Sequence, residues 1–266
     1  PMISTIGLGI IRPILRVTCA SFPSTEFMAP PLLLLPFLTD ESHANMATDL
    51  WMLRAFPRPD CPRLRHYGWN RPCHTFGYGQ DFDWVAKQTG EPFESLCRRP
   101  TGGGLVDHRD DWTYSLVIPA VHPAAGCQIR ASYEALHRAL AEAMSLLGVE
   151  TKAVDPPSRK GGEGDFPSSP GHCFEEPVAY DLSRLEDGAK VAGAAMKRGR
   201  EGLLLQGSIQ RQLVPDLSWE QLIALFSQRL ALFLETIVEA IDWPSGWEEA
   251  REPFLKEIES AEWQRR

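Results

Sequence analysis

One long amphipathic pattern constrains the folding of this sequence more than any other feature. Between Gln128 and Leu147, apolar residues recur every three or four positions, and neither Pro nor Gly interrupts them. Residues at this spacing share one face of an α-helix. The pattern therefore predicts a helix over residues 128–147 whose apolar face is formed by Ile129, Tyr133, Leu136, Leu140, Met144 and Leu147.

Four further segments show helical patterns. Residues 42–56 carry apolar side chains at helical spacing, and we expect this helix to pack against a sheet. Residues 81–90 predict a short helix that stops at a glycine. Two amphipathic helices are expected at 218–241 and 245–263, separated by an Asp-Trp-Pro sequence.

The other patterned segments favour β-strands joined by turns. Residues 64–80 carry aromatic and β-prone side chains around a central turn, which predicts two strands. Two short strands are expected at 105–106 and 112–118. Asp187-Gly188 lies between two strand-like segments and predicts a β-hairpin, and a further strand is expected within 202–212.

Two segments lack such patterns. Residues 151–172 are rich in Pro, Gly, Ser and charge, so we expect a mobile loop there. Residues 1–40 include a moderately apolar stretch that arginines interrupt, which indicates a disordered leader or an overextended start, with Met28 or Met46 as alternative starts. The expected organisation is a poorly ordered leader at 1–40 followed by a single domain at 41–266.

Composition and charge narrow the function classes. The 27 Lys and Arg residues against 35 Asp and Glu residues give a net charge of −8, which argues against attraction to nucleic acid or an anionic membrane surface. No apolar run approaches the ~20 residues of a membrane span. The six cysteines are scattered, which indicates mostly reduced thiols in a cytoplasm rather than a secreted disulfide scaffold.

The segment from Arg98 to Gly104 is the first candidate binding site. Gly102, Gly103 and Gly104 let backbone N–H groups approach a ligand closely. Arg98 and Arg99 offer forked donors that are permanently charged. The segment has neither the Lys-Ser/Thr of a Walker loop nor the GxGxxG spacing of a dinucleotide fold. A surface hairpin turn is the alternative interpretation.

Three further residues could carry chemistry. Cys173 lies between the expected loop and a strand, where a cation such as Lys190 could activate its thiol. His108 could bind substrate or transfer protons near neutral pH. A buried cysteine, a solvated lysine and a structural histidine are the alternative interpretations. No metal site is expected, because the Cys and His residues between positions 61 and 74 fit no zinc motif.

Taken together, these motifs resemble those of the lipoate–protein ligase and octanoyltransferase family. Their order and spacing agree with the family's, and the similarity runs from about residue 45 to about residue 209. The resemblance implies an α/β fold, with a mixed β-sheet flanked by helices as in biotin and lipoate ligase catalytic domains. The shared features are Arg98-Arg99-x-Thr101-Gly102-Gly103-Gly104, His108, Cys173-Phe174 with Tyr180, and Lys190-x-x-Gly193-x-Ala195.

The Cys-Phe pair resembles the octanoyltransferases of the LipM type and the related amidotransferases. By this resemblance, Cys173 is the nucleophile that takes an octanoyl group from acyl carrier protein and passes it to a lysine of a lipoyl domain. Such domains belong to 2-oxoacid dehydrogenases and to the glycine cleavage H protein. Lys190 positions the acyl carbonyl, and Gly193 binds substrate together with the family-motif residues of 98–108. The transferred group is octanoate or lipoate, and neither a metal nor a nucleotide is required.

Docking of a carrier protein needs a local basic patch, because carrier proteins are acidic and this chain is acidic as well. The candidate residues are Arg98, Arg99, Arg109, Lys197, Arg198 and Arg200.

Three alternatives stay open. An ATP-dependent lipoate–protein ligase would use ATP and Mg²⁺, although the Asn-Asp pair that such ligases usually carry is absent here. A lipoyl amidotransferase would take the acyl group from an octanoylated lipoyl domain, and a non-catalytic module would bind the acyl group or lipoate without transfer. Two features depart from the family: Gly207-Ser208 follows Gln206 where relatives often have His-Gly-Ser, and the loop at 151–172 is long.

Overall fold

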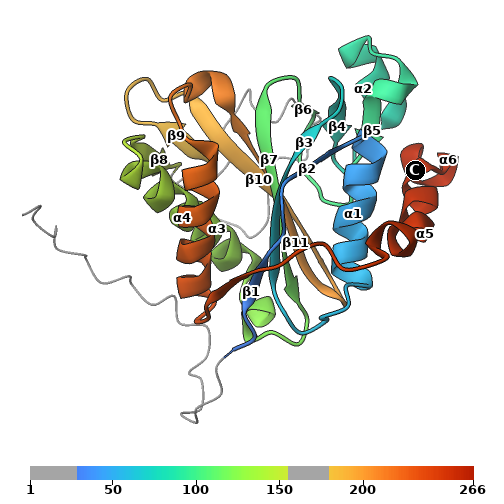
Figure 1. Cartoon of the computed structure of the whole chain (residues 1–266). Coiled ribbons are helices and arrows are strands. Elements are labelled where there is room, and N and C mark those ends of the chain that lie inside the picture. Colours follow the sequence, from blue (N-terminus) through green and yellow to red (C-terminus); the bar gives the residue numbers. More distant parts are fainter. Residues whose placement is uncertain (1–28, 155–179) are drawn as a thin grey trace, which may run out of the picture.

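The computed structural model describes residues 29–154 and 180–266. Within these ranges a mixed β-sheet runs through the centre of the molecule and helices cover both of its faces (Figure 1). This confirms the expected α/β fold. The strand order is β12-β1-β3-β7-β11-β10-β9-β8, and β2 pairs with β3 beside this path. A smaller sheet has the order β5-β4-β6.

The strands are β1 (Leu32–Leu34), β2 (Leu38–Asp40), β3 (Arg63–Trp69), β4 (His74–Phe76), β5 (Leu96–Arg98), β6 (Val106–Asp107), β7 (Asp111–Pro119), β8 (Thr151–Ala153), β9 (Leu182–Arg184), β10 (Lys190–Gly199), β11 (Gly202–Gln210) and β12 (Val238–Ala240). The helices are α1 (Ser42–Arg54), α2 (Phe82–Thr89), α3 (Ile129–Leu146), α4 (Trp219–Phe233), α5 (Trp247–Glu259) and α6 (Ala261–Gln264). The predicted helix at 128–147 is therefore confirmed as α3.

The central strands distribute their side chains between the two faces of the sheet. β3, β7 and β11 pair antiparallel, and successive residues of a strand point to opposite faces. Leu116 and Leu205 belong to the core under α3 and α4. Val117 and Leu204, one position away on the same strands, belong to the core under α1. Each strand thus contributes to two cores, and the α1 side is the one that carries the candidate site.

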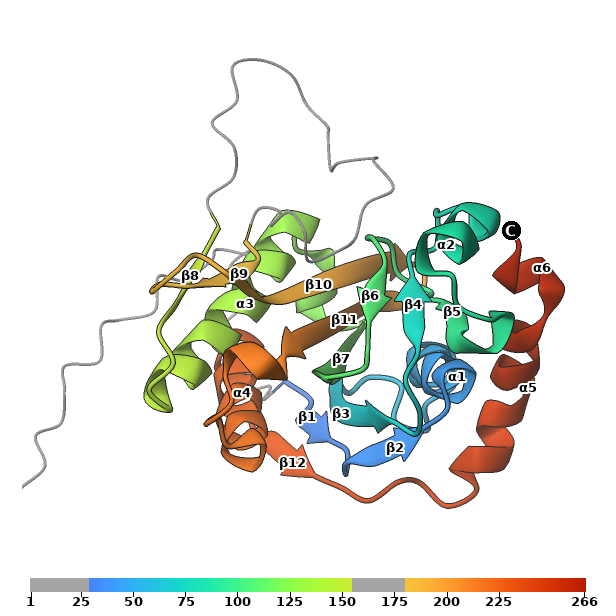
Figure 2. The same ribbon diagram turned by 90° about the horizontal axis from the view of Figure 1, so that it is seen from above.

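The helix predicted at 42–56 is α1, and it packs against the sheet as expected. Its outer side is covered by α5, which the chain reaches by running from β12 around the edge of the sheet (Figure 2). Trp51 of α1 is fully buried, with ring centroids 6.4 Å from Trp243 and 6.1 Å from Trp247. The C-terminal segment therefore closes the α1 side of the molecule.

The small sheet carries the glycine loop, which is the segment from Arg99 to Leu105 between β5 and β6. Figure 2 shows this sheet beside α2 and above α1. The predicted short helix with a glycine stop is confirmed as α2, which the Asp81 side chain caps and which ends at Gly90 with φ 66°. The strand predicted at 105–106 is present as β6, whereas β5, which precedes the loop, was not predicted.

The predicted hairpin around Asp187-Gly188 is confirmed, since β9 and β10 pair antiparallel and Gly188 has φ 77°. That φ lies in the left-handed region, where glycine pays no steric penalty. The register of this pair shifts between Lys190 and Ala192, as in a β-bulge. Bulges change the direction of nearby side chains.

The expectation that residues 1–40 form a poorly ordered leader is wrong for the part that the structure describes. β1 lies between β12 and β3 and pairs parallel with both strands. Leu32 and Leu33 are fully buried. A short apolar run between prolines is compatible with a buried strand, and periodicity alone cannot distinguish the two interpretations. Residues 1–28 lie outside the described ranges.

Three other boundaries differ from expectation. The loop expected at 151–172 begins with β8, which pairs with β9, and its remainder from 155 lies outside the described ranges. The helix expected at 218–241 ends at Phe233, because Glu235 has φ 53° and the chain then turns into β12. The helix expected at 245–263 is divided at Ser260, whose side chain caps α6.

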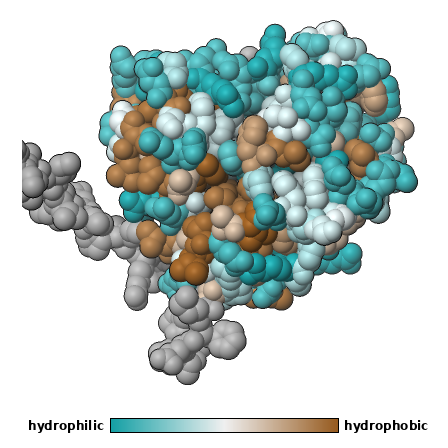
Figure 3. Space-filling view, in the orientation of Figure 1, coloured by the Kyte–Doolittle hydropathy of each residue, from teal (hydrophilic) through white to brown (hydrophobic). Residues whose placement is uncertain are grey.

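Apolar residues also reach the surface on the face drawn in Figure 3. Leu232 at the end of α4 and Ile237 before β12 are 54% and 58% exposed.

Within residues 29–154 and 180–266, no helix combines the length and the apolar character needed to cross a membrane.

Candidate active site

A pocket opens between the main sheet and the glycine loop. Its walls combine apolar side chains, small residues of β10 and a few polar groups, which is the usual composition of a small-molecule site. The lining residues are Met46, Tyr67, Trp69, Thr75, Arg99, Val106, His108, Thr113, Gly193, Ala194, Ala195, Gln206, Gly207 and Ser208.

Most polar lining groups come from one face of the sheet. Thr113, Gln206 and Ser208 are adjacent in sequence to apolar residues that face α3 and α4, and these three residues are buried, as is Tyr67. In an amphipathic strand such alternation usually marks a solvated face. Here the polar face is covered by α1 and by the glycine loop, so it forms the wall of the pocket.

Arg99 lines the pocket and organises the glycine loop. Its Nη1 donates to the backbone oxygen and the hydroxyl of Thr75 at 2.8 and 2.9 Å. Its Nη2 donates to the carbonyl oxygens of Gly102 and Gly104 at 2.9 and 2.7 Å. The Arg99 guanidinium therefore holds the glycine loop by binding its carbonyl groups. Gly102, Gly103 and Gly104 themselves are not among the residues that line the pocket.

Two glycines permit this close packing. Gly103 has φ 84°, a conformation that side-chain-bearing residues rarely adopt. A Cβ placed on Gly77 would lie 1.9 Å from the carbonyl oxygen of Gly103. The segment after β4 and the glycine loop can therefore approach each other only through glycine backbone.

Arg98 has a structural role instead. It is fully buried and donates to the carbonyl oxygens of Tyr78 and Gln80, both at 2.7 Å, and of Gln264 at 3.0 Å. It is not among the residues that line the pocket. It connects the small sheet to α6 in the C-terminal segment.

The expected docking patch is wrong for two of its members, because Arg98 is fully buried and Arg99 is only 5% exposed. Both arginine side chains donate hydrogen bonds to backbone carbonyl oxygens, which the sequence alone does not reveal. The other candidates lie nearer the surface. Arg109 pairs with Asp107, and Arg200 pairs with Glu201. Arg198 donates to the carbonyl oxygen of Cys127, and the Lys197 Nζ lies 4.9 Å from the centroid of the Tyr78 ring.

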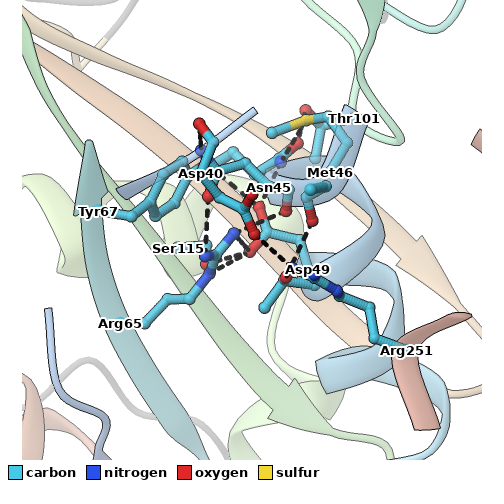
Figure 4. A network of polar contacts seen from close by, with 12 residues as sticks. Asp40, Asn45, Met46, Asp49, Arg65, Tyr67, Thr101, Ser115 and Arg251 are labelled. Atoms are coloured by element: carbon cyan, nitrogen blue, oxygen red, sulfur yellow. Dashed lines mark hydrogen bonds and ion pairs between the residues drawn. The ribbon is translucent and has the colours of Figure 1, made fainter. Parts of the chain in front are cut away.

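A buried polar network lies behind the pocket (Figure 4). The Thr101 hydroxyl donates to Gln206 Oε1 at 2.6 Å, and Gln206 Nε2 donates to Asp49 Oδ2 at 2.6 Å. Asp49 forms a fully buried ion pair with Arg65 at 2.7 Å, and it also accepts hydrogen bonds from hydroxyl groups on β3 and β7. Hydrogen bonds of this kind offset the desolvation of a buried pair. The network ties the glycine loop to α1 and β3.

His108 lines a second wall of the pocket. Its Nδ1 lies 2.7 Å from Asp111 Oδ2, its Nε2 lies 2.7 Å from Thr75 Oγ1, and its ring centroid is 4.1 Å from that of Trp69. Burial tends to raise the pKa of Asp111, but the neighbouring His108 and three hydrogen bonds hold that pKa below its usual value. His108 thus forms a hydrogen bond with the Thr75 hydroxyl, and this hydroxyl in turn accepts a hydrogen bond from Arg99.

Lys190 is the first residue of β10, as predicted, but its side chain is buried rather than solvated. Its Nζ lies 2.8 Å from Asp181 Oδ2, and the two side chains are 4% and 1% exposed. Tyr180, immediately before Asp181, has φ 73°, which is uncommon for a residue with a side chain. Gly193 adjoins the ion pair and lines the pocket.

Cys173, the predicted nucleophile, lies outside the described residues. Cys61, Cys73 and Cys97 are free and buried. Burial raises the pKa of the Cys97 thiol to about 12 and raises that of Cys73 as well, so neither is an activated thiol.

The structure brings Arg99, His108 and Gly193 together around one pocket, with Thr101 and Lys190 directly behind its walls. In residues 29–154 and 180–266, no group of three or more His, Cys, Asp or Glu side chains could hold a metal ion. Sequence reasoning missed the acidic partners, which are Asp49, Asp111 and Asp181. The sequence could have indicated Asp49 as a buried acid, because a carboxylate three residues after Met46 falls on the apolar face of the predicted helix.

Comparison with known proteins places this architecture in a family. Residues 41–221 match the family model of the lipoyl protein ligase A/B catalytic domain. Octanoyltransferase LipM of Oceanobacillus iheyensis is 37% identical over 168 residues, which cover 62% of this chain and 58% of that protein. Octanoyltransferase LipM of Symbiobacterium thermophilum is 34% identical over 229 residues, which cover 79% of this chain and 78% of that protein.

Solved structures show the same fold. A T. acidophilum protein, Ta0514, described as a lipoate protein ligase with bound lipoic acid, has a TM-score of 0.64 at 18% identity, covering 89% of this chain and all of that one (100%). Lipoate-protein ligase A bound with ATP has a TM-score of 0.63 at 21% identity, covering 88% of this chain and 98% of that one.

This chain belongs to the lipoyl protein ligase A/B catalytic domain family, which confirms the resemblance of the motifs. The region that aligns with the O. iheyensis relative spans 58% of that protein's length. The solved structures, at identities of 18% and 21%, establish the fold of the domain and its mixed sheet flanked by helices.

Proposed function

We propose that this chain is an octanoyltransferase of protein lipoylation, which moves an octanoyl group onto a lysine of a lipoyl domain. The observation that carries the proposal is its similarity to octanoyltransferases LipM, at 37% and 34% identity. The pocket agrees with this role, because its apolar walls and its small β10 residues suit a linear acyl chain.

In the proposed reaction, the Cys173 thiolate attacks the carbonyl carbon of octanoyl–acyl carrier protein. A C–S bond to Cys173 forms, and the bond to the carrier's sulfur breaks as that sulfur leaves as a thiolate and takes up a proton. The ammonium of Lys190 stabilises the negative oxygen of the tetrahedral intermediate. In the second half, the neutral lysine amine of the lipoyl domain attacks the acyl-enzyme and its C–N bond forms. The C–S bond to Cys173 breaks, the Cys173 thiolate departs, and the nitrogen releases a proton to solvent.

The scheme requires neither a metal nor a nucleotide, because both half-reactions exchange a thioester for another acyl bond. The partners are acyl carrier protein and lipoyl domains, including those of 2-oxoacid dehydrogenases and the glycine cleavage H protein. Nucleic acid and membrane are not partners in this scheme. Because the attacking group must be a thiolate, the proposed compartment is the reducing cytoplasm.

The decisive experiment measures the intact mass of the reduced protein after incubation with octanoyl–acyl carrier protein in the absence of ATP. We expect an octanoyl adduct on wild type and on Cys61→Ser, and none on Cys173→Ser. Cys61 is a suitable control because its free, buried thiol belongs to the core under α1. The adduct is then expected to pass to an added apo lipoyl domain, and absence of any adduct would contradict the proposal.

The same assay distinguishes the alternatives. A lipoate ligase would need ATP and lipoate, would form an adenylate and would tolerate Cys173→Ser. A lipoyl amidotransferase would accept the acyl group from an octanoylated lipoyl domain rather than from acyl carrier protein. A non-catalytic module would bind octanoate without forming an adduct.

A further inference from the structure

The ion pair between Lys190 and Asp181 stands next to the pocket without being part of its lining. Both side chains are almost fully buried, and the 2.8 Å distance joins Lys190 Nζ to Asp181 Oδ2. A buried ammonium group is costly unless an opposite charge and hydrogen bonds compensate it. The position of Asp181 therefore determines where the Lys190 ammonium can lie.

Asp181 is itself anchored from α3. The Tyr133 hydroxyl lies 2.8 Å from Asp181 Oδ1 and 2.6 Å from the carbonyl oxygen of Ala194, and it accepts a hydrogen bond from the Ala194 N–H at 3.1 Å. Its one proton can be donated to either oxygen. Tyr133 therefore links the acid to the strand segment that forms the pocket wall.

Gly193 explains how the pair reaches the pocket. A Cβ at this position would lie 3.0 Å from Lys190 Cε, 3.2 Å from Asp181 Oδ1 and 3.3 Å from Lys190 Nζ. The Lys190 side chain thus packs over the bare backbone of Gly193, and Gly193 lines the pocket. The β-bulge between Lys190 and Ala192 contributes to this orientation.

Within the part of the chain that the structure describes, the titratable groups that face the pair from neighbouring elements are Tyr133 and His137 on α3 and Tyr114 on β7. Burial lowers the pKa of His137 to about 4, so this histidine is neutral near pH 7. Burial also raises the pKa of Tyr114, so this phenol is neutral as well. Among the described residues, Asp181 is the group that supplies negative charge to Lys190.

We propose that Asp181 is a positioning residue for the reaction, which holds the Lys190 ammonium against Gly193 so that it faces the acyl carbonyl. Tyr133 fixes Asp181 to the wall of the pocket. This inference rests on the proposed function, because it assigns Asp181 a role through Lys190. It also predicts a property of the unliganded protein, which is the protection of the Lys190 amine from chemical labelling.

The first measurement is therefore independent of catalysis. Lys190 in the unliganded protein is labelled with acetic anhydride at one fixed pH, and peptide mass spectrometry gives the labelled fraction. In Asp181→Asn the Lys190 side chain loses the carboxylate that holds it over Gly193, so we expect a larger labelled fraction than in wild type. A general loosening of the fold would instead raise the labelling of Lys197, further along the same strand, by a similar factor.

The second measurement is the rate at which octanoyl–acyl carrier protein acylates Cys173. We expect Asp181→Asn to lower this rate by about 10- to 100-fold, with Asp181→Glu restoring part of it. Asp187→Asn, at the exposed tip of the same hairpin, is the matched control and should leave both measurements unchanged. Tyr133→Phe provides a second test if Asp181→Asn does not fold.

An unchanged labelled fraction of Lys190 in Asp181→Asn, or in Tyr133→Phe if it replaces it, overturns the inference. A raised labelled fraction with an unchanged acylation rate overturns it equally. If wild type forms no adduct, the proposed function fails, and the labelled fraction still decides whether Asp181 holds the Lys190 side chain in place.

Discussion

Two buried ion pairs among the described residues, Asp49–Arg65 and Asp181–Lys190, differ in what surrounds them. Asp49 and Arg65 lie behind the glycine loop, where the carboxylate also accepts hydrogen bonds from Tyr67, Ser115 and Gln206. Asp181 and Lys190 lie beside Gly193, a residue of the pocket wall. The first pair is enclosed by polar side chains, and the second adjoins small residues that leave space for a ligand.

This difference separates a structural pair from one suited to chemistry. An arginine presents several donors in a rigid plane, so Arg65 can also hold the backbone of Asn45 while it binds Asp49. A lysine ammonium is a compact point charge on a flexible stem, and a small movement can direct it toward a developing oxyanion. Four predictions test the comparison.

Loss of the enclosed pair should have the largest effect on stability. Asp49→Ala leaves Arg65 buried without its counter-charge, and we expect the free energy of unfolding to fall by about 3–5 kcal/mol. Urea denaturation measures the change. Asp187→Ala, which removes an exposed pair with Arg184, is the control and should change the unfolding midpoint little. A similar response of both variants would remove the structural distinction.

Replacement of the second pair by apolar residues should separate activity from stability. In Lys190→Met combined with Asp181→Leu, we expect octanoyl transfer to fall by about 100- to 1000-fold, because the cation proposed to stabilise the oxyanion is lost. The free energy of unfolding should stay close to wild type, because apolar residues of similar volume often replace a buried pair without loss. Full transfer activity in this variant would show that the second pair is structural too.

Acid pH should weaken the fold on the side of the second pair through His137. Its pKa is lowered to about 4 by burial, so between pH 6.5 and 4 the unfolded chain binds a proton that the folded chain does not. The stabilising contribution is therefore complete above pH 6.5 and is lost as the pH falls. At pH 5 this group should cost about 2 kcal/mol, which His137→Gln should abolish when urea denaturation is compared at pH 7 and 5. Parallel pH curves for both proteins would contradict this.

The smallest effect is expected where the first network reaches the glycine loop. Thr101→Val removes the hydroxyl that donates to Gln206, and we expect a loss of about 1 kcal/mol in the free energy of unfolding. Thr89→Val is the matched control, because the Thr89 hydroxyl bonds only within its own helix end and loop. An equal loss in both variants would show that the network does not anchor the loop.

The sequence was most informative where local periodicity decides structure. The helix at 128–147, the short helix that stops at Gly90 and the hairpin at Asp187-Gly188 follow from the spacing of apolar residues and from turn chemistry. The sequence was least informative where a strand pairs with segments that are distant along the chain. β1 is a short strand whose neighbours are β12 and β3, and nothing within residues 32–34 indicates that partnership.

The candidate site shows the same division. Motif residues such as Arg99, His108 and Gly193 could be selected from the sequence, and they meet around one pocket. The sequence predicts a surface patch that includes Arg98 and Arg99, because sequence alone does not distinguish an arginine bound by carbonyl groups from a solvated one. The structure decided that question, since burial depends on the segment that covers a residue.

By itself, the sequence determined the family, the main helices and the order of the motif residues, because these depend on neighbours in the chain. Only the tertiary structure decided which carboxylate accompanies each buried cation. Asp49 reaches Arg65 from another element, and Asp181 reaches Lys190 across a hairpin. Electrostatic partnership depends on distance in space and on burial, and neither quantity is encoded by spacing along the chain.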